Sequence, residues 1–223
     1  LYKMFEPALD RQGLRRVHDL LVAASNQLMY LELNGIAVDI PYNFRLGDEY
    51  LGRITELETR INDIVRSSTD SSITEINPRS PKQIHEYFGS QGITVSSTDV
   101  DTLTAKLSTL RRESGAAQFM LTLLEHRRQQ KLYSTYVQGI RKRVYRGRVY
   151  TTYLLHGTTS GRLASRNPNL QNIVRDKGIK RQFVASRSDH VLVHCDYKQA
   201  EARVMATLAQ DVYLQRVLSD PTI

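Results

Sequence analysis

Residues 191–203 read Val-Leu-Val-His-Cys-Asp-Tyr-Lys-Gln-Ala-Glu-Ala-Arg, and the hydrophobic period changes in the middle of this segment. The β-branched run 191–193 predicts a short buried strand. The apolar residues that follow recur at helical spacing: Ala200, Val204, Met205, Leu208 and Ala209. They predict a helix, so that Asp196 lies between strand and helix, where a carboxylate can face a metal or a phosphate. Taken alone, an aspartate in this position is more typical of a helix N-cap than of a metal ligand.

Two further strings precede this segment, Thr-Thr-Ser-Gly-Arg-Leu-Ala-Ser at 158–165 and Pro-Asn-Leu-Gln-Asn-Ile at 168–173. Together with Asp-Tyr-Lys-Gln-Ala-Glu-Ala-Arg at 196–203, they closely resemble the palm of family A DNA polymerases in content, order and spacing. The resemblance implies an α+β fold: a helical thumb subdomain plus a partial antiparallel-sheet palm subdomain of a polymerase right hand, with the fingers absent.

Length and composition place the chain among ordinary globular proteins, because 40% of its 223 residues are hydrophobic. No apolar run approaches the roughly 20 residues that cross a bilayer, and no signal-peptide pattern opens the chain. We therefore expect a cytoplasmic protein with no membrane partner, of bacterial, phage-like or organellar origin. The single cysteine, Cys195, cannot form an internal disulfide and is expected to be a small core residue.

Positive charge is concentrated in one part of the sequence. Between Glu125 and Arg187 there are fifteen Lys or Arg residues against two acids, whereas the formal charge of the whole chain is +8. A basic segment with an acidic remainder indicates a surface that binds a polyanion. A solvated basic surface without a partner is the alternative.

The N-terminal part predicts a helix over 14–31, which Asn34-Gly35 ends, and an extended segment over 36–39. Residues 31–39 resemble the start of the polymerase domain in the same family. The resemblance assigns residues 20–41 to the beginning of that domain and 1–19 to the tail of an upstream exonuclease-like domain. Since the chain begins at Leu1 and ends at Ile223, we expect a fragment or a split product.

Residues 42–143 are expected to form the thumb. Apolar residues at alternating steps of four and three predict a long helix with a narrow seam: Tyr50, Ile54, Leu57, Ile61 and Ile64. A polar loop follows at 67–72, and a second helix is expected over 116–139. Two long helices match the family's thumb, although periodicity alone is compatible with any helical hairpin.

Two places in this thumb resemble contacts of the family with the DNA backbone. In the string 77–83, Asn77, Ser80 and Lys82 belong to a loop that leads into a short helix, where amides and hydroxyls hold phosphate. On the second helix, Arg127 and Lys131 are four residues apart and share a face. Such contacts position DNA without reading its sequence.

Residues 144–223 are expected to form the first part of the palm, opened by a strand pair around Gly147. By resemblance, Arg162 lies in the minor groove at the primer terminus and senses base-pair geometry. Asn169 and Gln171 would touch the duplex nearby. Their alternative role is a loop whose amides satisfy backbone groups.

The resemblance also implies the chemistry. Asp196 would bridge two Mg²⁺ ions, with the backbone carbonyl of Tyr197 completing one coordination shell. Glu201, with Gln199 beside it, would select deoxyribose by filling the space of a ribose 2′-hydroxyl; pairing of Glu201 with a neighbouring cation is the alternative. Lys198 stands where the family has a serine, which places a cation near the triphosphate.

The sequence thus predicts template-directed DNA synthesis by a two-metal mechanism, with primer–template DNA and deoxynucleoside triphosphates as partners. The second metal-binding carboxylate and the fingers would come from a C-terminal remainder, so the fragment alone is expected to be inactive. A non-catalytic duplex-DNA-binding subunit derived from such a polymerase is the alternative.

Overall fold

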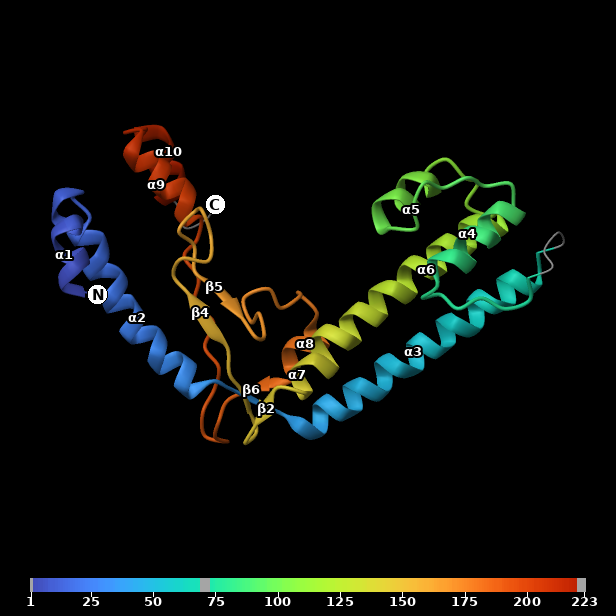
Figure 1. Ribbon diagram of the computed structural model, residues 1–223, viewed down its shortest axis with the longest axis horizontal. Helices are drawn as coiled ribbons and strands as arrows, with labels where there is room; N and C mark the ends of the chain where they lie inside the picture. The colour runs from blue at the N-terminus through green and yellow to red at the C-terminus, as the bar shows by residue number, and fades with distance from the viewer. Residues whose placement is uncertain (1, 69–72, 220–223) are drawn as a thin grey trace. The chain divides into compact units, whose positions relative to one another are not determined.

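The computed structural model describes residues 2–68 and 73–219 and shows an α+β fold (Figure 1). Its elements, in chain order, are α1 Tyr2–Arg11, α2 Arg15–Asn34, β1 Ile36–Val38, α3 Ile40–Arg66, α4 Pro81–Ser90, α5 Val100–Leu107, α6 Gly115–Leu132, a π-helix Tyr133–Gln138, α7 Gly139–Arg141, β2 Val144–Tyr145, β3 Arg148–Val149, β4 Thr152–Leu154, β5 Ala164–Arg166, α8 Lys177–Arg181, β6 Phe183–Val184, α9 Ala200–Leu208 and α10 Val212–Ser219. The chain divides into two compact units, Leu1–Ser186 and Arg187–Ile223.

The predicted long helix is α3. It begins where the Asp39 carboxylate accepts a hydrogen bond of 2.9 Å from the amide of Tyr42, with Pro41 in the first turn. Its predicted seam is buried at Tyr50, Ile54 and Ile61, and α6 runs back along it in the opposite direction (Figure 1). Residues 69–72 of the predicted polar loop lie outside the described residues.

The predicted second helix is longer and less regular than expected. It is α-helical as α6, continues as the π-helix 133–138 and ends in α7. In the π-helix, the carbonyls of Tyr136 and Val137 accept hydrogen bonds from the side chains of Gln182 (3.0 Å) and Asn43 (3.2 Å). A π-helix changes the direction of backbone carbonyls, which here meet buried amide donors.

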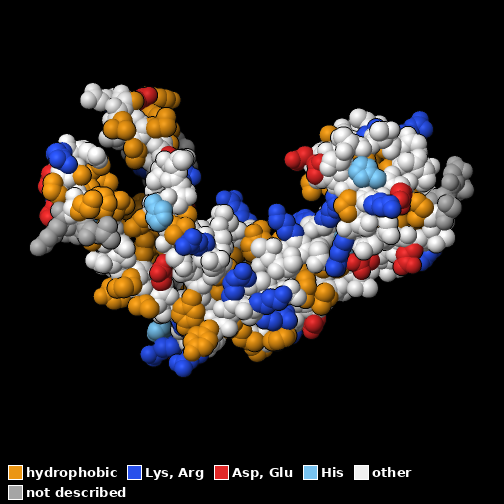
Figure 2. Space-filling view, viewed as in Figure 1, with side chains coloured by type: hydrophobic (Ala, Val, Ile, Leu, Met, Phe, Trp, Pro, Cys, Tyr) orange, Lys and Arg blue, Asp and Glu red, His pale blue; other side chains and the backbone are white. Residues whose placement is uncertain are grey.

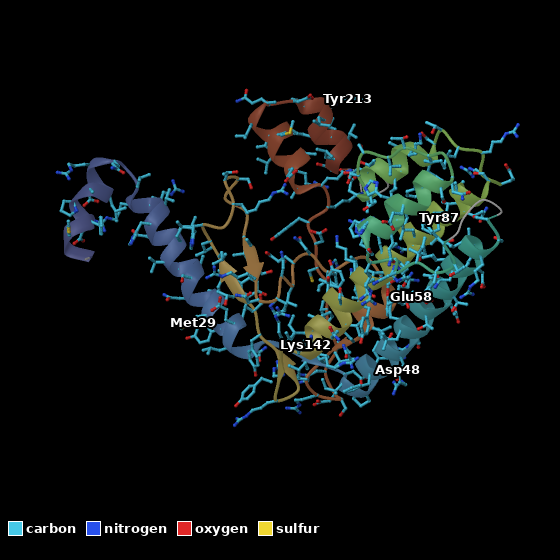
Figure 3. All side chains as sticks on the ribbon, turned by 45° about the vertical axis from the view of Figure 1, so that its right-hand side comes forward. Met29, Asp48, Glu58, Tyr87, Lys142 and Tyr213 are labelled. Carbon is cyan, nitrogen blue, oxygen red and sulfur yellow. The ribbon has the colours of Figure 1, made fainter. Side chains whose placement is uncertain are left out.

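The far end of the hairpin, which we call the tip, has its own core. Tyr87 and Phe88 of α4 pack on Phe119 of α6, with ring centroids 4.3 and 5.4 Å apart. Aliphatic residues from α3, α5 and α6 complete this core, and Figure 3 shows Tyr87 among these helices. Burial of this largely apolar cluster stabilises the tip.

An antiparallel sheet lies at the base of the hairpin, with strand order β2-β3-β1-β6. The predicted strand pair is confirmed: β2 and β3 are joined by a turn in which Arg146 and Gly147 have φ of 48° and 74°. Positive φ at both positions is typical of a two-residue hairpin turn. A separate two-stranded sheet pairs β4 with β5.

The predicted N-terminal helix is confirmed as α2, and Gly35 ends it with φ of 57°. Its apolar residues are not buried, however, and Leu20, Leu31 and Leu33 are all more than half exposed. The periodicity therefore indicates the helix correctly without showing what its apolar face contacts.

In the second unit α9 and α10 pack together through Ala206 and Leu218, as predicted for a helix after Gln199. The predicted buried strand at 191–193 is wrong. These residues have no regular structure, and Val191 and Val193 are 81% and 77% exposed. Cys195 is likewise exposed and not a core residue. A strand forms only where another strand satisfies its backbone groups, and none of the described residues pairs with this run.

None of the helices within 2–68 and 73–219 is both long and apolar enough to cross a membrane.

Candidate nucleic-acid interface and carboxylate site

The loop 77–80, which we call the tip loop, is closed by its own side chains. The Asn77 side-chain oxygen accepts from the backbone amide of Arg79 (2.9 Å), and the Gln83 side chain accepts from the backbone amide of Asn77 (2.7 Å). Ser80 caps α4 by accepting from the amide of Gln83 (3.4 Å). The Asn77 amide group and the Ser80 hydroxyl keep hydrogens to donate, as a phosphate contact requires. The ammonium group of exposed Lys82 lies on the next turn, 3.9 Å from Glu86.

The structure separates the two cations predicted on α6. Lys131 is exposed, whereas Arg127 is partly buried and donates a hydrogen bond to the backbone carbonyl of Thr98. Burial lowers the pKa of Arg127 from its ordinary value, and the nearby Asp99 carboxylate raises it partly back. Arg127 therefore holds the start of α5 against α6 in addition to any role at the surface.

The tip loop and α6 meet at one pocket of about 290 Å³. Its lining includes Pro78 and Arg79 from the loop, and Arg127, Lys131 and Ser134 from the helices. Two regions predicted separately as DNA contacts are thus brought side by side. The sequence prediction missed Arg79, for which only its position between Asn77 and Ser80 was a signal.

Positive side chains also gather where α6, α7 and α8 lie (Figure 2). The exposed members of this group are Lys142, Arg143, Lys177, Lys180 and Arg181. Other cations of the basic segment support the fold: Arg148 donates to the Asn34 carbonyl (2.5 Å) and the Ser186 hydroxyl (2.7 Å). Hence the charge of the segment divides between structural bonds and an exposed basic surface.

Arg162, Asn169 and Gln171 lie on exposed loops around β5. Gly161, before Arg162, has φ of 72°. The Asn169 side-chain oxygen accepts hydrogen bonds from the Ser165 hydroxyl (3.1 Å) and from the backbone amides of Gln171 (3.1 Å) and Asn172 (3.2 Å). Asn169 thus shapes the loop, as its alternative interpretation expects, while the side chain of Gln171 faces solvent.

Asp196 is exposed in the irregular segment before α9. It is not the helix N-cap, because that position belongs to Gln199, which has φ of 53°. Glu201 lies in the first turn of α9, where the helix dipole favours an acid. Arg203, one of its candidate ion-pair partners, donates instead to the backbone carbonyls of Lys198 (2.8 Å) and Leu218.

The Asp196 carboxylate and the Tyr197 carbonyl are hard oxygen donors of the kind that Mg²⁺ prefers. Throughout the part of the chain that the structure describes, no three His, Cys, Asp or Glu side chains are grouped so that they can hold a metal. These residues therefore fit a share of a magnesium site and do not form a complete one.

Residues 45–221 match the family model for DNA polymerase family A, and this range includes all three palm-like strings. The chain belongs to the family A DNA polymerases. It is 33% identical over 190 residues to DNA polymerase I of Helicobacter pylori, covering 82% of this chain and 20% of that protein. Against DNA polymerase I of Geobacillus stearothermophilus it is 30% identical over 223 residues, covering 95% of this chain and 24% of that protein.

A solved structure agrees with this assignment. The POL domain of Pol1 from M. smegmatis, in complex with DNA primer-template and dNTP, aligns with a TM-score of 0.63 and 27% identity, over 82% of this chain and 32% of that chain. The chain thus spans only about a fifth to a quarter of the length of the curated relatives.

Proposed function

We propose that the chain is part of a DNA polymerase that extends a primer 3′-hydroxyl by template-directed nucleotidyl transfer. Residues 42–143 correspond to the thumb and 144–223 to the first part of the palm. Residues 20–41 begin the polymerase domain, and 1–19 are the tail of an upstream domain. The fingers and the rest of the palm belong to a C-terminal remainder, in keeping with the share of the relatives that the chain spans.

The observation that carries this proposal is the exposed Asp196 in a family A motif. Its carboxylate caps no helix, so it is available as a ligand. Two Mg²⁺ ions, when bound, would activate the primer 3′-hydroxyl and neutralise the phosphate charge. Asp196 and the Tyr197 carbonyl would provide oxygen ligands to them. Glu201, in the first turn of α9, excludes a ribose 2′-hydroxyl, with Gln199 beside it.

The helical hairpin provides the grip on duplex DNA. Lys82, Lys131 and the donors of Asn77 and Ser80 address phosphates, while Arg162 reads pair geometry from the minor groove. Arg127 contributes mainly by holding α5 against the helix that carries Lys131. Because these groups address the backbone, the grip is independent of sequence.

A non-catalytic duplex-binding subunit is a second candidate. The observation in its favour is the incomplete metal-ligand set among residues 2–68 and 73–219. Both candidates predict DNA binding, but only the first predicts that the chain contributes to primer extension.

Fluorescence anisotropy with two primer–templates of unrelated sequence tests the shared part of the proposal. We expect equal affinity for both, and a slope of log K against log[salt] of about −0.9 for each phosphate neutralised. A strong preference for one sequence, or binding that is insensitive to salt, contradicts it.

A further inference from the structure

A polar contact crosses the interface between α3 and α6. His126 of α6 is 1% exposed, and its Nε2 lies 3.0 Å from Oε1 of Glu58 on α3. An ionised carboxylate only accepts hydrogen bonds, so the contact places a proton on Nε2. Since a buried imidazole requires a partner, Glu58 holds the two helices in one register. Figure 3 shows Glu58 on α3 beside α6.

Glu58 also faces the tip loop. The Arg79 guanidinium lies 3.7 Å from the same Oε1 atom, and it donates to the Gln130 side chain of α6 at 2.8 Å. Arg79 thus connects the loop to both long helices. The Arg79 side chain is 61% exposed, as Lys82 and Lys131 are exposed, but its guanidinium contacts acceptors on both long helices.

The tip loop is otherwise closed on itself and on α4. Its amides at Asn77, Arg79 and Ser80 bond to Gln83, Asn77 and Asn77 respectively. These bonds fix the shape of the loop.

The place of the loop is set by the Ile76 amide, which donates to the Asn62 side chain of α3 at 2.9 Å, by the packing of α4 on α6, and by the Arg79 contacts. Among the hydrogen bonds and ion pairs of the described residues, only the Arg79 contacts join the loop itself to α6, so the distance between the donors of the loop and Lys131 depends in part on them.

We infer that Glu58 is a positioning residue: by pairing with His126 and Arg79 it sets the tip loop at the spacing from α6 that one stretch of DNA backbone requires. Glu58 touches no DNA in this scheme and acts through Arg79. The inference rests on the proposed DNA grip. It gives the contact between Glu58 and His126 a role beyond the packing of α3 against α6.

The charge of Glu58 makes the inference testable. Glu58→Gln keeps the side-chain shape and an oxygen that accepts from His126, but it removes the ion pair with Arg79. Removing an acid next to a polyanion site strengthens binding if only electrostatics matters. Loss of positioning weakens binding instead, so the two explanations predict opposite signs. Glu56→Gln is the matched control, because exposed Glu56 on the same helix carries the same charge.

The experiment combines duplex-binding titrations with hydrogen exchange of the tip-loop amides in the 223-residue chain without DNA. We expect Glu58→Gln to weaken binding by about three- to tenfold with an unchanged salt slope, and to speed exchange at 77–80, while Glu56→Gln does neither. Glu58→Gln combined with Arg79→Gln should speed exchange no more than Arg79→Gln alone.

The outcomes separate this inference from the proposed function. Equal behaviour of Glu58→Gln and Glu56→Gln in both measurements overturns the positioning role. Faster loop exchange in a chain that binds no duplex supports the loop anchor and refutes the DNA grip. If Glu58→Gln does not fold, Arg79→Gln decides the question, since unchanged exchange in that variant also overturns the inference.

Discussion

The side chains of Asn43 and Gln182 share a buried hydrogen bond of 2.7 Å that joins the start of α3 to the residue after α8. Both residues are 0% exposed. Arg141 donates to the Asn43 side-chain oxygen at 2.7 Å, and the Asn43 side chain also donates to the Val137 carbonyl of the π-helix. The Gln182 side chain donates to the carbonyls of Tyr136 in the π-helix and Ile179 in α8. One buried polar network thus connects the start of α3 with the π-helix, α7 and the end of α8.

Asn43→Ala removes the centre of this network. It leaves the buried Gln182 side-chain oxygen without its donor and the Arg141 Nε without its acceptor, so we expect it to lower the free energy of unfolding by about 2–4 kcal/mol. Urea denaturation measures this loss. Asn26→Ala, on the exposed surface of α2, is the control and should change stability by less than about 0.5 kcal/mol. A similar small effect of both substitutions contradicts the network's structural role.

Asp99 makes the stability of the tip dependent on pH. Hydrogen bonds with Ser97 and with the backbone and hydroxyl of Thr102 hold the pKa of its carboxyl well below the usual 3.8. When the pKa of a carboxyl is lower in the folded state than in the unfolded state, the ionised carboxyl stabilises the fold at every pH above the unfolded pKa. This contribution is lost as the pH falls from the unfolded pKa through the folded pKa.

Asp99→Ala should therefore lower the melting temperature at pH 7, and the difference from wild type should shrink as the pH falls below about 3.8. Thermal denaturation between pH 7 and pH 2 measures both effects. Asp99 is the N-cap of α5, and Asp101→Ala, in the first turn of α5, is the control. A difference that stays constant over this range shows that the Asp99 charge is not involved.

Substitution of Lys131 should mainly affect DNA binding, whereas substitution of Arg127 should mainly affect stability. Lys131→Ala removes an exposed phosphate-binding cation and should reduce the magnitude of the salt slope by about one. Arg127→Ala removes the bond to Thr98 and should lower stability by about 1–2 kcal/mol, with a smaller change in slope. Anisotropy titrations and urea denaturation of both variants separate the effects. If both variants change the salt slope equally and Arg127→Ala loses no stability, Arg127 binds phosphate directly and has no structural role.

The helices of the hairpin and the strand pair around Gly147 were predictable from sequence because their signals are local. Apolar spacing determined α3, and positive φ at a two-residue turn favours glycine. The π-helix was not predictable, because its carbonyls are satisfied by Asn43 and Gln182, which are distant in sequence.

In the segment around Asp196, by contrast, local signals in the sequence were not sufficient. A β-branched run shows strand preference, but a strand also requires a neighbour, and none of the described residues pairs with 191–193. For the same reason the exposure of Cys195 could not be read from its type. The resemblance identified Asp196, while only the structure showed that Gln199, and not Asp196, occupies the N-cap.

Glu201 provides a test of substrate selection in a polymerase that contains this chain. If its side chain fills the space of a 2′-hydroxyl, Glu201→Ala should reduce discrimination against ribonucleotides by about two orders of magnitude. Glu201→Gln keeps the size and should retain most of it. Single-turnover incorporation of matched dNTP and rNTP pairs measures the ratio. If the ratio is unchanged in Glu201→Ala, Glu201 has no part in sugar selection.

Primer extension tests the central claim most directly, because it requires Asp196 to act within a complete polymerase. The chain alone should extend no primer. Together with the C-terminal remainder it should extend a primer in the presence of Mg²⁺, and Asp196→Asn should abolish this activity while leaving duplex affinity unchanged. Asp189→Asn, which alters another exposed aspartate of the same unit, is the control and should remain active. Extension by the chain alone, or full activity of Asp196→Asn, would contradict the account.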